Sequence, residues 1–125
     1  MFWDHASETL ARPTHEQLQL HRLQATLQRV AQRVPFYQRQ FAELGISPEK
    51  IKSLADVRRL PFTTGADLQA IYPDGMLAVD HDELVRLHTS SGTTGKPKAI
   101  FFSLKDVDNA TELIARSLVM TGITK

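Results

Sequence analysis

The 125-residue sequence contains no cysteine, which excludes disulfide bonds, thiolate metal sites and a cysteine nucleophile within it. It has no apolar run near the roughly 20 residues of a membrane-spanning helix, and residues 1–5 do not begin a signal peptide. Lysine and arginine, 15 together, nearly balance 14 aspartates and glutamates, and no basic stripe carries interleaved aromatics. We therefore expect a cytoplasmic protein with neither nucleic acid nor membrane as a partner.

Metal ligation is also not predicted. The five histidines show no i, i+4 spacing on one helix face, and no cysteine is available to complete a site. An acidic cluster, Asp80, Asp82 and Glu83, lies in a turn before a strand and is expected to be solvated. His88 ends that strand, and it is interpreted either as structural support or as a contact in a ligand site.

Residues 14–34 carry the strongest periodic pattern. Thr14 with Gln17 predicts a helix start of the capping-box type, and Pro35 predicts the end. The opposite, polar face includes Gln24 and is expected to be solvated. The apolar residues that recur at steps of three and four, and so define one helical face, are Leu20, Leu23, Leu27, Val30 and Val34.

Shorter helices are predicted after this one. Gly45 is expected to close a helix that begins near residue 36, and further starts are expected at Ser47, at Ser53 and at Thr64. Residues 1–75 are therefore predicted to be mostly helical. The aromatic residues of this region are expected to pack in the core rather than to form an acid-binding pocket: Trp3, Phe36, Tyr37, Phe41 and Phe62.

The pattern changes in residues 76–125. Residues 84–88 and 98–102 read as strands, and Ser103 with Asp106 predicts the start of a helix that runs toward Gly122. The predicted fold class is mixed α/β: a helical segment, then a short β-hairpin packed on the last helix. Because the sequence stops at Lys125 with that helix uncovered, we expect a fragment of a longer protein that self-associates or has low stability.

The loop between the two strands is the most informative feature. Residues 89–96 are all Ser, Thr, Gly or Lys, a mixture that supplies hydroxyl donors, a freely turning backbone and a positive charge. Two residues, not four, separate its glycines, so it is not a Walker A loop; a flexible hairpin loop is the plainer alternative. The residues predicted to bind a polyphosphate are Ser90, Ser91, Gly92, Thr93, Thr94, Gly95, Lys96 and Lys98.

Residues 89–98 resemble the phosphate loop of the adenylate-forming superfamily, which includes acyl-CoA synthetases, adenylation domains and luciferases. Blocks 34–37, 60–64 and 72–79 further resemble the phenylacetate–CoA ligase subgroup. Two positions depart from its pattern: Gly65 stands where a lysine is usual, and Lys98 where a threonine is frequent.

This resemblance implies that residues 1–125 form part of the large N-terminal domain of an AMP-forming acid–CoA ligase. The implied reaction activates a carboxylic acid, such as the aryl acid phenylacetate, as an acyl-adenylate and transfers it to coenzyme A. It implies ATP, Mg²⁺ and coenzyme A as cofactors, with the loop holding the β- and γ-phosphates. The later motifs of the family have no match, so no catalytic residue is assigned and the 125 residues alone are expected to be inactive.

Two other functions remain open. One keeps adenylation but transfers the activated group to an acceptor other than coenzyme A. The other is a stand-alone helical interaction module that uses the apolar face of residues 20–34 to bind another helix.

Overall fold

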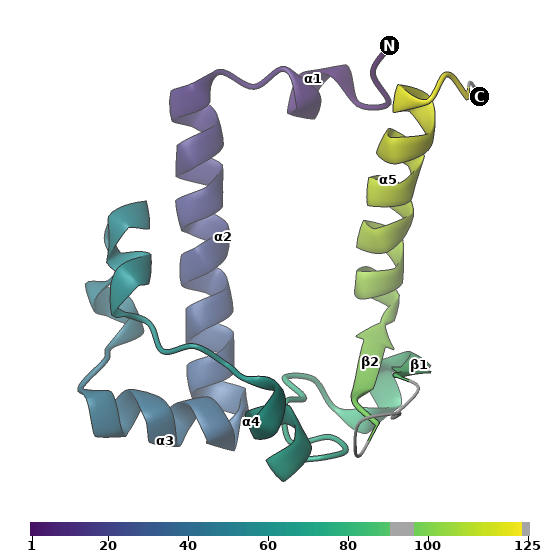
Figure 1. Cartoon of the computed structure of the whole chain (residues 1–125). Helices are drawn as coiled ribbons and strands as arrows, with labels where there is room; N and C mark the ends of the chain where they lie inside the picture. The colour runs from purple at the N-terminus through teal and green to yellow at the C-terminus, as the bar shows by residue number, and fades with distance from the viewer. Residues whose placement is uncertain (91–96, 124–125) are drawn as a thin grey trace.

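The computed structural model describes residues 1–90 and 97–123. Two long helices, α2 (Arg12–Arg33) and α5 (Leu104–Met120), stand on opposite sides of the molecule in Figure 1. The short α1 (His5–Glu8) lies at one end, and α3 (Pro35–Leu44), α4 (Gly65–Ala70) and a two-stranded sheet lie at the other. The remaining elements are β1 (Leu84–Thr89), β2 (Ala99–Ser103) and three 3₁₀ turns, η1 (Pro48–Lys50), η2 (Leu54–Arg59) and η3 (His81–Glu83). The predicted mixed α/β class is confirmed.

The first long helix begins earlier than the sequence pattern predicts. Helix α2 starts at Arg12 after Ala11 without any side-chain cap, so the start predicted at Thr14 is wrong. Pro13 lies in its first turn, where the missing N–H has no intrahelical partner to lose. The predicted end is confirmed: Val34 is extended, because a residue before proline is disfavoured in the helical region.

The core lies where α2 meets α3 and η1. Leu27, Phe41 and Ile51 form a buried cluster, against which Leu23 and Val30 pack. The predicted apolar face of α2 is therefore used inside this chain. Gln24, expected in solvent, is partly buried, and its Nε2 donates to the backbone oxygen of Ile51 at 2.8 Å, so this prediction is wrong. A buried carbonyl needs such a partner.

The aromatic residues divide into packed and exposed ones. Phe36 and Phe41 are buried, and the hydroxyl of Tyr37 lies 2.7 Å from Oγ1 of Thr63. Phe62 is 91% exposed in the extended connection between η2 and α4, so its predicted core position is wrong. Aromatic character alone does not reveal which way a side chain of this connection points.

Capping boxes begin several of the helical elements. At η2, α4 and α5 the side chain of the residue just before the helix pairs with the backbone N–H three residues on. The acidic side chain at that third position pairs in return with the backbone N–H of the capping residue. The starts predicted at Ser53, Thr64 and Ser103 are thus confirmed. Each box satisfies two backbone donors that a helix start leaves unpaired.

Helix α5 follows directly on β2 and continues away from the hairpin in Figure 1. The predicted packing of the hairpin on this helix is therefore limited to their junction. The second half of α5 meets the N-terminal segment: Trp3 Nε1 donates to Glu112, at the middle of the helix, at 2.7 Å, and Arg116 pairs with Asp4 at 3.8 Å.

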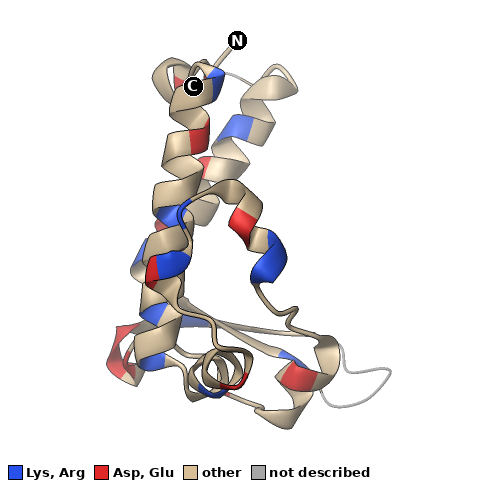
Figure 2. Cartoon of the chain, turned by 90° about the vertical axis from the view of Figure 1, so that its left-hand side faces the viewer, with Lys and Arg blue, Asp and Glu red and all other residues tan. Residues whose placement is uncertain are grey.

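Acidic and basic residues are interspersed along the helices in Figure 2. In the described part of the chain, no helix combines the length and the apolar character that crossing a membrane requires.

Candidate functional site

The hairpin brings the two ends of the predicted phosphate loop together. Strands β1 and β2 are antiparallel, with Thr89 opposite Ala99 at the end of the ladder. Beyond that pair, the N–H of Ser90 donates to the backbone oxygen of Lys98 at 3.1 Å. The N–H of Lys98 donates in return to the Ser90 hydroxyl at 2.9 Å. Ser90 and Lys98 thus form a two-bond clasp across the base of the loop.

The predicted phosphate-binding residues divide between described and undescribed positions. Ser91, Gly92, Thr93, Thr94, Gly95 and Lys96 lie outside the residues that the structure describes. Ser90 and Lys98 are described, and the structure brings them together as neighbours. The Ser90 hydroxyl accepts in the clasp, so its own hydrogen is not used there and can serve an anion as a donor.

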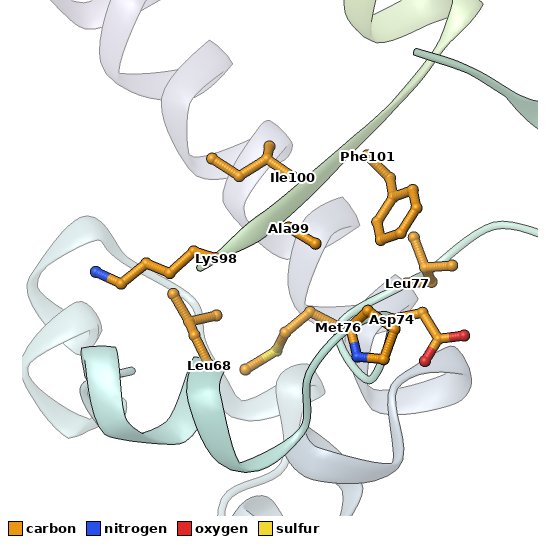
Figure 3. Close-up of a pocket in the computed structure, with 9 residues that line it drawn as sticks. Leu68, Asp74, Met76, Leu77, Lys98, Ala99, Ile100 and Phe101 are labelled. Atoms are coloured by element: carbon orange, nitrogen blue, oxygen red, sulfur yellow. The ribbon is translucent and has the colours of Figure 1, made fainter. Parts of the chain in front are cut away.

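The side chain of Lys98 extends toward the start of α4. A Cβ placed on Gly65, the first residue of α4, would lie 3.4 Å from the Lys98 Nζ and 3.7 Å from its Cε. Figure 3 shows the Lys98 side chain directed away from β2, above Leu68 of α4. The two positions that depart from the resemblance, Gly65 and Lys98, are therefore neighbours in the structure.

A cavity of about 240 Å³ lies between α4, the turn that follows it and β2 (Figure 3). Its lining is apolar except at Lys98 and Asp74, and the Asp74 carboxylate lies 3.1 Å from His81 Nε2. The apolar lining residues are Leu68, Pro73, Met76, Leu77, Ala99, Ile100 and Phe101. The sequence did not predict this cavity. The cap signature at Thr64 predicts the start of α4, which forms one of its walls through Leu68.

His88 lies on the hairpin, where it is cross-strand to Ile100. Its ring centroid is 4.9 Å from that of Phe102, two positions along the partner strand. Rings at such diagonal positions stabilise a hairpin. The contact supports the structural interpretation of His88.

The acidic cluster before β1 has structural partners. Asp80 and Glu83 form the capping box of η3, and Asp80 also lies 3.5 Å from Arg33. Across residues 1–90 and 97–123, no group of three or more histidines or acids is arranged to hold a metal ion.

No protein-family model matches the chain, but individual proteins do. It is 43% identical over 105 residues to a phenylacetate-coenzyme A ligase of Aromatoleum evansii, with 84% of this chain and 24% of the relative covered. A phenylacetate-coenzyme A ligase of Thermus thermophilus is 41% identical over 122 residues, which cover 98% of this chain and 27% of the relative. The corresponding Escherichia coli ligase is 40% identical over 115 residues, 92% of this chain and 26% of the relative.

Solved structures agree with these relatives. A 2-hydroxyisobutyryl-CoA ligase in complex with 2-HIB-AMP and CoA, in the thioesterification state, superposes with a TM-score of 0.82 at 32% identity. The same ligase in the postadenylation state with 2-HIB-AMP gives 0.81 at 30% identity. Each match covers 92% of this chain and 25% of the solved chain. The chain thus spans about a quarter of the length of the relatives it matches.

Proposed function

Because this chain is homologous to the phenylacetate-coenzyme A ligases, we propose that it forms about a quarter of an ATP-dependent, AMP-forming acid–CoA ligase. Within that whole protein, residues 90–98 hold the β- and γ-phosphates of ATP. The observation that supports this most directly is the clasp between Ser90 and Lys98, which holds the base of a loop rich in glycine and hydroxyl groups.

The proposed reaction has two steps. A carboxylate oxygen of the acid attacks the α-phosphorus of ATP, and pyrophosphate leaves as the acyl-adenylate forms. The thiol of coenzyme A then attacks the acyl carbon, and AMP leaves. The loop takes no covalent part; it positions the phosphates and stabilises the negative charge that passes to pyrophosphate.

The described residues suit a polyphosphate. Lys98 carries a positive charge that forms no ion pair within residues 1–90 and 97–123, and the Ser90 hydroxyl retains a hydrogen to donate. Anions gain most from such donors when no carboxylate competes at the same place. Mg²⁺, when bound, neutralises phosphate oxygens; no described acid of this chain is assigned to it.

The acid is proposed to be an aryl acid such as phenylacetate. The relatives named for phenylacetate are 40–43% identical to this chain, against 30–32% for the structures named for 2-hydroxyisobutyryl-CoA. Coenzyme A is proposed as the acceptor because both groups of proteins are named for it.

The test uses the whole ligase that contains these residues. Pyrophosphate release and thioester formation are measured with phenylacetate, 2-hydroxyisobutyrate and unrelated acids, with and without coenzyme A. We expect ATP-dependent thioester formation that is fastest with an aryl acid. Pyrophosphate release without a thioester product would indicate another acceptor, and no release with any acid would contradict adenylation itself.

The stand-alone interaction module loses its main support in the structure. Its proposed binding face is the apolar side of α2, and that side packs against α3 and η1 within this chain.

A further inference from the structure

Gly65 is not required by the backbone. Among the described residues, the glycines with positive φ are Gly45 and Gly122, whereas Gly65 is the first helical residue of α4. In the middle of a helix, glycine lowers stability relative to alanine by about 0.5–1 kcal/mol; Gly65 stands at the first position of α4. The backbone would therefore accept a side chain at position 65.

The Lys98 side chain lies beside position 65. A Cβ on Gly65 would lie in direct contact with the Lys98 Nζ and Cε, at 3.4 and 3.7 Å. Leu68 lies on the same face of α4 as Gly65, because residues three apart are neighbours on a helix surface. Leu68 lines the cavity together with Lys98. The end of the Lys98 side chain therefore lies next to Gly65, and Figure 3 shows this side chain above Leu68 of α4.

The acids close to this face are engaged elsewhere. The carboxylate of Asp67 accepts from the backbone N–H and the hydroxyl of Thr64 at 2.7 Å each. The Asp74 carboxylate lies at hydrogen-bond distance from His81. No ion pair within residues 1–90 and 97–123 involves Lys98, so its charge remains for another anion.

We propose that Gly65 is a positioning residue for ATP: it leaves open the space beside the start of α4 in which the Lys98 ammonium lies. This inference rests on the proposed function, in which Lys98 faces the phosphates. A side chain at position 65 changes the place of the ammonium without itself touching the nucleotide.

The experiment introduces Gly65→Ala, Gly65→Gln and Gly65→Glu into the whole ligase, each alone and combined with Lys98→Met. Alanine adds a Cβ at ordinary contact distance. Glutamine and glutamate have the same size, but only glutamate can pair with the ammonium and draw it away. Glutamate is also favourable in a first helical turn, so the fold of α4 is preserved; thermal unfolding of each variant verifies this.

The readouts are KM for ATP, KM for the acid, and kcat. We expect KM for ATP to rise in the order Ala, Gln, Glu, reaching about tenfold for Gly65→Glu, since a charge-assisted contact is weakened. KM for the acid should stay within about twofold of the original value. In the Lys98→Met background, Gly65→Glu should have no additional effect on KM for ATP.

Two results would overturn the inference while leaving the proposed function in place. One is an equal effect of Gly65→Glu with and without Lys98, which would show direct repulsion of the phosphates. The other is an unchanged KM for ATP in every Gly65 variant although Lys98→Met raises it. If Lys98→Met alone changes nothing, the phosphate role of Lys98 fails, and the inference fails with it.

Discussion

At the scale of single residues, the Ser90 hydroxyl has a role in the structure besides the one that the sequence predicted. The sequence predicted Ser90 as a phosphate donor, and the structure shows its oxygen accepting the N–H of Lys98. One hydroxyl can do both, because it has one hydrogen and two lone pairs. Ser90 is thus proposed to shape the loop as well as to contact the nucleotide.

Ser90→Ala should therefore raise KM for ATP in the whole ligase by about two- to tenfold, since a neutral hydrogen bond is worth about 0.5–1.5 kcal/mol. Ser90→Thr keeps the hydroxyl and should remain closer to the original value. Steady-state kinetics with ATP as the varied substrate measures both. An alanine variant with unchanged kinetics would argue against the clasp as a positioning device.

The threonines of the loop are predicted to contact phosphate directly. Thr93→Ala or Thr94→Ala should each lose a charge-assisted hydrogen bond of about 1.5–3 kcal/mol, a fall in kcat/KM for ATP of about ten- to 150-fold. Pyrophosphate release measures the fall. Unchanged ATP affinity together with an unchanged adenylation rate in both variants would contradict the assignment of this loop.

At the scale of elements, hydrogen-bonded caps position the segments around the site. Helix α4, which carries Gly65, begins with the Thr64–Asp67 box, and α5 follows β2 through the Ser103–Asp106 box. The Thr64 hydrogen bonds lower the pKa of Asp67, and the Ser103 hydrogen bonds lower that of Asp106. For Asp56 in η2, hydrogen bonds from the Lys52 backbone and from Ser53 lower the pKa in the same way.

These lowered pKa values predict acid sensitivity. The ordinary value of each aspartate is 3.8, and the folded value lies below it. The stabilisation is complete above the unfolded pKa and is lost as the pH falls through the folded one. The urea midpoint of the 125-residue chain should therefore be constant from about pH 7 to 5 and fall below about pH 4.

A matched pair of variants isolates one cap. Asp106→Asn removes the titrating group, so its urea midpoint should depend less on pH in the acid range. Ser103→Ala removes the N-cap hydroxyl and should lower the free energy of unfolding by about 0.5–2 kcal/mol at neutral pH. A pH dependence that is identical in the Asp106→Asn variant would show that this cap does not contribute.

At the scale of the whole molecule, the chain exposes more surface than a self-contained protein of its size. Its accessible surface is 9221 Å² at a mass of 14.1 kDa, whereas a folded monomer of that mass exposes about 6,700 Å². Large apolar side chains are among the exposed ones: Leu113 and Ile114 of α5 are 62% and 59% exposed. An excess of about 2,500 Å² is comparable with the area of an obligate interface.

Isolated as 125 residues, the protein should therefore self-associate or be marginally stable. Gel filtration over a range of concentrations should show an apparent mass that rises with concentration. Replacing Ile114 and Leu118, neighbours on one face of α5, by serine should reduce this association. A chain that remains strictly monomeric and unfolds cooperatively would contradict the prediction.

Expectations from the sequence mostly agree with the structure where they depend on residues close together in the chain, and they fail where they depend on distant ones. The amphipathic pattern of α2 identified its buried face correctly, yet the first turn was misplaced because the helix begins at Arg12, after Ala11, without a side-chain cap. Phe62 was assigned to the core from its aromatic character, but its exposure depends on the path of the connection between η2 and α4.

By itself, the sequence determined the strands, the capped helix starts and the phosphate-loop signature, because each depends on hydrogen bonds or spacings between residues a few positions apart. Only the tertiary structure decided that Lys98 lies over Gly65 and that Gln24 bonds to Ile51, 27 residues away. Such contacts depend on how whole elements pack, and packing places together residues that share no local pattern.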